Sequence, residues 1–190
     1  MVTTMKNLNM MPLDTTDHLV HPEEFDEVTL YSSALTIFTD FKEHQPVVIE
    51  GDTAAIQAEF LMRKAHVRLK LVVDRGDELI GTISLNELDE QNFIQHLRKG
   101  VCRQDILVRD LMLPRARIKA ISYRELKTAS VDDVIHTLQQ NHQQHCLVLD
   151  PDQHHIRGII SASDITRRLH MPLVIEKPPT FIDIFQAVKP

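Results

Sequence analysis

The stretch Gly158-Ile-Ile-Ser-Ala-Ser-Asp164 decides the fold of this chain. It follows an apolar run that ends in an aspartate, Cys146-Leu-Val-Leu-Asp150, and a polar turn, and it predicts the end of a strand and the start of a helix. A weaker copy stands upstream, where Gly81-Thr-Ile-Ser-Leu-Asn-Glu87 follows Leu71-Val-Val-Asp74 and a turn. Because the unit occurs twice, the sequence predicts two similar units that bury their faces on each other.

The segments before the two motifs also repeat in the same order. Val47-Val-Ile49 predicts a short strand, and Asp52 or Thr53 is expected to cap the helix that follows it. Three apolar residues share one face of that helix: Ala55, Ala58 and Met62. In the second half, Ile118 to Tyr123 predicts a strand and Ser130 caps a helix. The apolar face of this helix consists of Val131, Val134, Ile135 and Leu138.

The predicted fold class is therefore α/β (α+β), with two β-α-β-β-α repeats paired into one module. Residues 1–44 form an N-terminal extension, 45–100 the first repeat, 101–170 the second repeat, and 171–190 a linker and tail. The tail has apolar residues at helical spacing between Phe181 and Val188, which predicts an amphipathic helix that packs on its own domain, on a dimer mate or on a partner.

Composition excludes several classes of protein. The net charge of −6 argues against a nucleic-acid binder, whose affinity comes from neutralising phosphates. Local basic clusters still occur, around Arg63 to Lys70 and around Arg115 to Lys119. No apolar run approaches the about eighteen residues of a membrane helix, and no signal peptide is recognised. With only two cysteines, Cys102 and Cys146, we expect free thiols in a cytoplasmic protein.

The repeated pattern resembles the CBS (cystathionine-β-synthase type) domain family, in which two such repeats pair into a regulatory Bateman-type module. The resemblance covers about residues 45–170. It rests on Gly158 to Asp164 with the following Ile165-Thr-Arg-Arg-Leu169, on the strand before Asp150, and on Val108-Arg-Asp-Leu-Met112 as the lead-in to the second repeat.

The resemblance implies an adenosine ligand (AMP, ADP, ATP or S-adenosylmethionine) in a cleft between the repeats, and no other cofactor. It implies that Asp164 accepts hydrogen bonds from the ribose hydroxyls and that Ser161 contacts the ribose–phosphate region. It also implies that four residues flank the adenine: Ala120, Ile121, His145 and Cys146. A carboxylate accepts two donors from a cis-diol, and a helix start offers free N–H groups to phosphate.

Two observations temper this interpretation. Ser161 and Asp164 are also good helix-capping residues, so they suit a helix start without any ligand. In the first repeat Glu87 stands where an aspartate is expected, and its longer side chain overshoots the ribose or needs a shifted sugar. Ser84 and Glu87 are therefore the weaker second site, and the nucleotide is expected in the cleft served by the second repeat.

Catalytic signatures are missing from the sequence. The five glycines form neither a dinucleotide fingerprint nor a phosphate loop, and no nucleophile elbow or zinc-protease motif occurs. We therefore expect no enzyme and no metal site, although His142, His145 and Cys146 leave a transition-metal sensor open as an alternative.

The sequence thus predicts a non-catalytic regulatory module that forms a homodimer, binds an adenine nucleotide and signals to an unidentified protein partner. It predicts no nucleic-acid or membrane partner. The alternative from another class is a CBS pair without ligand that serves as a dimerisation or docking scaffold.

Overall fold

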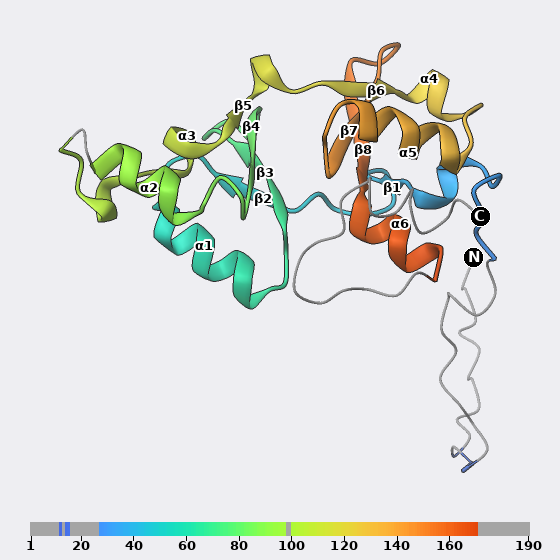
Figure 1. Ribbon diagram of the computed structural model, residues 1–190, viewed down its shortest axis with the longest axis horizontal. Coiled ribbons are helices and arrows are strands. Elements are labelled where there is room, and N and C mark those ends of the chain that lie inside the picture. Colours follow the sequence, from blue (N-terminus) through green and yellow to red (C-terminus); the bar gives the residue numbers. More distant parts are fainter. Residues whose placement is uncertain (1–11, 13, 16–26, 98–99, 171–190) are drawn as a thin grey trace, which may run out of the picture.

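The computed structural model describes residues 12, 14–15, 27–97 and 100–170, and it contains two four-stranded sheets flanked by helices (Figure 1). The predicted amphipathic tail and most of the N-terminal extension lie outside the described residues. Within them, the predicted α/β fold with two similar units is confirmed. We keep the proposed division and call residues 45–100 repeat 1 and residues 101–170 repeat 2.

Repeat 1 supplies three strands of one sheet: β2 (Val48–Glu50), β3 (Leu69–Val73) and β4 (Leu79–Ser84). β2 runs parallel to β3, and β3 pairs with β4 as an antiparallel hairpin. Helix α1 (Ala55–Lys64) crosses over from β2 to β3, and α2 (Glu90–Leu97) follows β4. The parallel pair needs such a crossover because a tight turn cannot connect two parallel strands.

Repeat 2 follows the same plan in the other sheet. Its elements are β6 (Ala120–Ser122), α4 (Tyr123–Leu126), α5 (Val131–Gln140), β7 (His145–Asp150), β8 (His155–Ser161) and α6 (Ala162–Arg168). β6 pairs parallel to β7, and β7 pairs antiparallel to β8. The registers of the two hairpins correspond, with Leu69 opposite Ser84 in repeat 1 and His145 opposite Ser161 in repeat 2. Leu69 and His145 are therefore equivalent positions.

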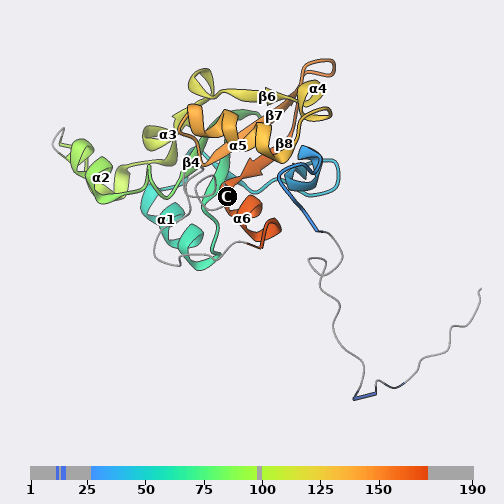
Figure 2. The same cartoon turned by 45° about the vertical axis from the view of Figure 1, so that its right-hand side comes forward.

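The fourth strand of each sheet comes from the segment that leads into the β-α-β-β-α unit of the other repeat. The first lead-in, residues 28–41, contains η2 (Ala34–Ile37) and β1 (Thr39–Asp40), and β1 pairs with β8 of repeat 2. The second lead-in, residues 103–117, pairs its strand β5 with β4 of repeat 1. The elements of the second lead-in are η3 (Arg103–Asp105), α3 (Val108–Leu111), β5 (Leu113–Pro114) and η4 (Arg115–Arg117). Helix α3 packs against β4 of repeat 1, and Figures 1 and 2 both show the two elements side by side.

Each repeat has its own core, which the opposite lead-in completes. The predicted apolar faces of α1 and α5 are confirmed, since all seven residues are buried. Ile106 and Val108 of the second lead-in join the core of repeat 1. Ala34 and Ile37 of the first lead-in join the core of repeat 2. Burying a large apolar side chain contributes about 1.5–3 kcal/mol to the stability of the fold. Each core therefore depends on the lead-in residues that it receives.

The predicted cap of α1 is wrong. The helix starts after Ala54 without a side-chain cap. The amide of Ala55 instead donates to the carbonyl of Ile106, at 2.8 Å, so the second lead-in satisfies a helix end that the sequence leaves to Asp52 or Thr53. The Asp52 carboxylate accepts hydrogen bonds from the guanidinium groups of Arg109, at 2.5 Å, and Arg75, at 3.2 Å.

The glycine that opens each motif makes room for the lead-in strand. A Cβ on Gly158 would overlap the carbonyl oxygen of Thr39 and the ring of Phe38. A Cβ on Gly81 would stand 2.6 Å from both the carbonyl oxygen of Leu113 and the sulfur of Met112. Side chains are therefore excluded at both crossings by close approach of the backbone.

We expect Gly158→Ala to lower the free energy of unfolding by about 2 kcal/mol, because the added methyl displaces β1 from β8. Urea denaturation measures the loss. Gly76→Ala is the matched control: its Cβ meets only the Asp74 side chain, at 3.3 Å, and the expected change is below about 1 kcal/mol. Equal losses in the two variants would contradict the role given to the glycine.

Candidate ligand-binding site

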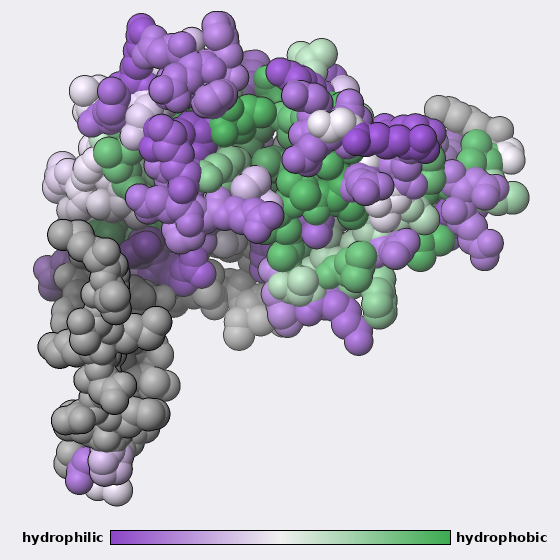
Figure 3. All heavy atoms as spheres, turned by 180° about the vertical axis from the view of Figure 1, so that it is seen from behind, coloured by the Kyte–Doolittle hydropathy of each residue, from purple (hydrophilic) through white to green (hydrophobic). Residues whose placement is uncertain are grey.

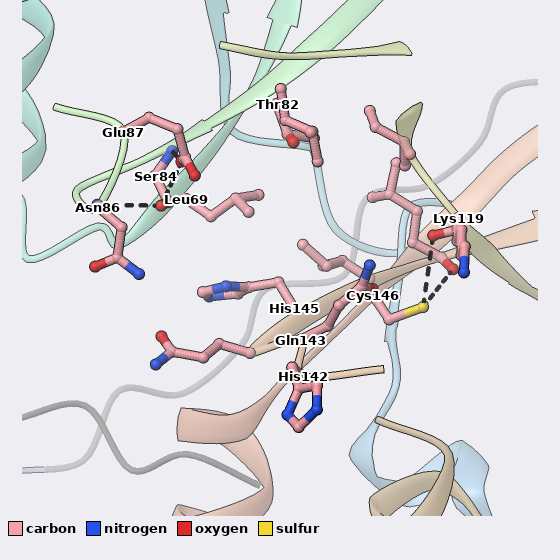
Figure 4. Close-up of a pocket in the computed structure, with 15 residues that line it drawn as sticks. Leu69, Thr82, Ser84, Asn86, Glu87, Lys119, His142, Gln143, His145 and Cys146 are labelled. Atoms are coloured by element: carbon pink, nitrogen blue, oxygen red, sulfur yellow. Dashed lines mark hydrogen bonds between the residues drawn. The ribbon is translucent and has the colours of Figure 1, made fainter. Parts of the chain in front are cut away.

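A cavity of about 310 Å³ lies between the two repeats, at the end of the sheets where β3 and β7 begin (Figure 4). Repeat 1 contributes the end of β4 and the turn after it, and repeat 2 contributes the start of β7 and the segment before β6. The lining residues are Leu69, Thr82, Ser84, Asn86, Glu87, Leu113, Ile118, Lys119, His142, Gln143, Gln144, His145, Cys146, Leu147 and Ile159.

The Ser84–Glu87 turn holds a carboxylate at the wall of the cavity. Oε2 of Glu87 accepts hydrogen bonds from the amide of Ser84, at 2.7 Å, and from its hydroxyl, at 2.5 Å. The Ser84 hydroxyl oxygen in turn accepts the amide of Asn86, at 3.2 Å. These bonds engage one oxygen of Glu87, and a carboxylate has lone pairs on both, so acceptor capacity remains for a ligand.

The opposite wall is set by the end of α5 and the start of β7. His142 ends the helix with a left-handed backbone (φ 52°), and the next amide, of Gln143, returns to the carbonyl of Leu138. The chain then enters β7 at His145. In Figure 4 His145 faces the Ser84–Glu87 turn across the cavity, and Lys119 and Cys146 lie at its other end.

His145 is the most strongly perturbed histidine of the described residues. The pKa of its imidazole is lowered to about 4, mainly by burial and to a smaller extent by the charge of Arg68. The carboxylates of Asp164 and Glu87 act in the opposite direction without compensating for the burial. His145 is therefore neutral at pH 7, and it offers one N–H donor and one acceptor nitrogen to a ligand.

Cys146 is a buried thiol and not a thiolate. Burial raises its pKa to about 11, and its Sγ lies 3.9 Å from the carbonyl oxygen of Lys119. A protonated thiol is a poor nucleophile and a poor metal ligand. Within the described ranges, no group of three or more His, Cys, Asp or Glu side chains is arranged to hold a metal ion. The metal-sensor alternative thus gains no support from the geometry around Cys146.

The predicted ligand residues fall into two groups. His145 and Cys146 line the cavity together with Ser84 and Glu87. Ser161 and Asp164 are not among the described residues that line it, although His145 pairs with Ser161 across β7 and β8. Ser161 caps α6, its hydroxyl donates to Asp164 at 2.7 Å, and Asp164 forms an ion pair with Arg167.

Ala120 and Ile121 lie in β6, opposite Leu147 and Val148 of β7. The two residues just before them, Ile118 and Lys119, line the cavity instead. The sequence did not reveal that the acidic Ser84–Glu87 turn of repeat 1 shares a cavity with the residues at the strand starts of repeat 2. The lining polar residues Asn86, Gln143 and Gln144 were also missed, because nothing in their local spacing distinguishes them from ordinary turn residues.

A basic pocket of about 470 Å³ adjoins this cavity, and the two share Ser84, Asn86, Gln144 and His145. Arg63, His66 and Arg68 line it, from the end of α1 and the loop that follows. The first basic cluster noted in the sequence therefore lies next to the cavity.

The chain belongs to the CBS domain family, whose pattern matches residues 39–90 and 126–171, just over half of the sequence. No curated protein matches it significantly. None of the helices in the described part of the chain is long and apolar enough to cross a membrane.

Three solved structures show the same fold. The Arabidopsis thaliana protein CBSX2, solved in complex with AMP, is 21% identical with a TM-score of 0.52, over 72% of this chain and 94% of that chain. An uncharacterised conserved protein of Pyrococcus horikoshii is 15% identical with a TM-score of 0.54, over 77% and 98%. A CBS domain protein of unknown function from Thermoplasma acidophilum is 19% identical with a TM-score of 0.50, over 79% and 76%.

The pKa of His145 predicts a specific pH dependence of stability. The unfolded chain takes up a proton at this residue as pH falls from about 6.5 to 4, whereas the folded chain does not, so stability is lost across that window. We expect His145→Leu, which installs the residue found at the equivalent position Leu69, to remove this loss. The free energy of unfolding of the variant, relative to that of the wild type, should therefore rise by about 3 kcal/mol between pH 7 and pH 4.

Urea denaturation at several pH values measures this difference, and the NMR signal of the His145 ring reports its ionisation directly. A wild-type ring that ionises near pH 6.5, or a stability difference that does not change with pH, would contradict the burial assigned to His145.

Proposed function

We propose that this chain is a non-catalytic regulatory CBS pair that binds an adenine nucleotide in the cavity between its repeats. The observation that carries the proposal is the chemistry of the cavity wall. An acidic turn, Ser84 to Glu87, faces a neutral imidazole, His145, and basic side chains lie next to them. These groups suit, in order, ribose hydroxyls, a purine ring and a phosphate. The AMP complex of CBSX2 supports the same class of ligand.

The two motif carboxylates, Glu87 and Asp164, occupy equivalent positions and compete for the role of ribose acceptor. The sequence favoured Asp164, with Ser161, and we retain that cleft as the second candidate position. We favour Glu87 because it lines the cavity together with His145 and Cys146, whereas Asp164 does not line it and forms an ion pair with Arg167. A longer carboxylate fits if the sugar is shifted.

Isothermal titration of the full chain with AMP, ADP, ATP and S-adenosylmethionine tests the proposal. We expect saturable binding of at least one nucleotide, and an affinity loss of about tenfold in Glu87→Gln, which removes the charge from the acceptor. Asp164→Asn, the same change in the other repeat, is the matched control and should bind nearly as the wild type does. The reverse pattern would place the nucleotide in the cleft of the second motif.

If none of these ligands binds below about 1 mM, the nucleotide proposal fails and the scaffold alternative takes its place. Circular dichroism of both variants checks that the fold is intact. A loss of binding together with a loss of helix signal would count as unfolding, and Glu87→Asp, which keeps the charge, then decides the role of the carboxylate.

We further propose that the chain is a homodimer formed through the helices of repeat 1. Hydrophobic residues gather over this part of the molecule on the face seen in Figure 3. Helices α1 and α2 expose five large apolar side chains: Ile56 (36%), Phe60 (58%), Leu61 (43%), Ile94 (39%) and Leu97 (38%). No large apolar side chain of α5 or α6 is comparably exposed. Exposed apolar side chains grouped in this way mark an interaction surface.

Analytical ultracentrifugation tests the dimer. We expect a dimer for the wild type and a monomer for Phe60→Asp, because a buried unpaired charge at the interface costs several kcal/mol. Tyr31→Asp is the control, since Tyr31 is 90% exposed but belongs to the first lead-in. A monomeric wild type, or equal behaviour of both variants, would contradict this interface.

The proposed signal passes through the segments that flank the repeats, before Gln45 and after Pro172, to a protein partner in the cytoplasm. The first lead-in supports this route, because β1 is the edge strand of the sheet that also holds His145. A nucleotide that binds two arrangements of the repeats with different affinity shifts their populations and so changes what the flanking segments present.

A further inference from the structure

Both hairpins carry a β-bulge at the same place, and a second groove lies beside the hairpins, at the opposite end of the sheets from the nucleotide cavity. In repeat 1 the register shifts between Val72 and Val73, which leaves Ile80 as the extra residue. In repeat 2 it shifts between Val148 and Leu149, which leaves Arg157 as the extra residue. Bulges of this kind re-aim side chains and often accompany functional sites.

This space, which we call the hairpin groove, has a volume of about 510 Å³ and an apolar floor. Its floor is formed by Val48, Leu71, Val73, Leu79, Leu149 and Ile156. Val48 and Leu149 are 40% and 39% exposed, although strand residues of this type are usually covered. A groove of this size with apolar walls is typical of sites for small organic molecules.

Charges of both signs stand around this floor. Lys42, just after the first lead-in, and Arg115, near the end of the second, lie on its rim with Asp77 and Glu78 of the first hairpin. No ion pair joins any of these four side chains to another residue in the described part of the chain. Arg157 also lines the groove, but its guanidinium is already bound to Asp40 through two hydrogen bonds, at 2.7 and 2.5 Å.

From this arrangement we propose that the hairpin groove is a second ligand site, which takes a small zwitterion with an apolar body, of the size of an apolar dipeptide. The carboxylate of such a ligand pairs with Arg115 and Lys42, its ammonium group pairs with Asp77 and Glu78, and its apolar side chains cover Val48 and Leu149. The site is separate from the nucleotide cavity and does not depend on nucleotide binding. Because the groove includes the ends of both lead-ins, its occupant connects the two exchanged segments.

Isothermal titration of the full chain with leucyl-leucine tests the site, with N-acetyl-leucyl-leucine and leucyl-leucine amide as analogues that lack one charge each. We expect saturable binding of the zwitterion and at least about fivefold weaker binding of either analogue, since each loses a charge-assisted hydrogen bond. Arg115→Gln should lower the affinity for leucyl-leucine by a similar factor. Arg117→Gln, two residues away and outside the groove, should leave it unchanged.

Three results would overturn the proposal: no saturable heat up to millimolar peptide, equal binding of all three peptides, or equal affinity in the Arg115 and Arg117 variants. Displacement of the dipeptide by AMP would place it in the nucleotide cavity and would also overturn it. Thermal unfolding of both arginine variants checks that the fold is intact. If Arg115→Gln is destabilised, Glu78→Gln tests the other end of the ligand.

Discussion

The close approach of each lead-in to a glycine of the opposite repeat is the constraint on which the rest of this structure depends. At Gly158 and Gly81 a backbone strand passes where a side chain would otherwise stand. The crossing lets β1 and β5 complete the two sheets, and it brings apolar lead-in residues into each core. The repeats are therefore joined by exchanged backbone segments as well as by side-chain packing, and one cannot move far without displacing a strand of the other.

This exchange also determines where ligands can bind. Two cavities lined by residues of both repeats lie at opposite ends of the sheets. The strand starts and the acidic Ser84–Glu87 turn form one opening, and the bulged hairpins form the other. The first opening combines groups from both repeats around His145. The affinity for a ligand at this opening would therefore depend on how the two repeats are arranged. Differential affinity for two such arrangements is what allows a binding module to regulate without catalysis.

Much of the fold could be predicted from the sequence, because its information is local. The apolar faces of α1 and α5 follow helical spacing, and the hairpin strands alternate with recognisable turns. The exchange of lead-ins could not be predicted, since the spacing within Val108 to Met112 does not specify which sheet it joins. The cap of α1 failed for the same reason: a distant carbonyl, of Ile106, replaces the local side chain. The ligand-binding role of Ser161 and Asp164 stays a prediction, because both residues serve equally as a helix cap and as a ligand contact.

Hydrogen–deuterium exchange of the full chain, with and without saturating AMP, tests the central claim that the nucleotide bridges the repeats. We expect AMP to slow amide exchange in two segments together, the Ser84–Glu87 turn of repeat 1 and the Gln143–Leu147 segment of repeat 2. Such joint protection requires a ligand that contacts both repeats at once. Protection confined to one repeat, or an unchanged exchange pattern in the presence of bound AMP, would contradict it.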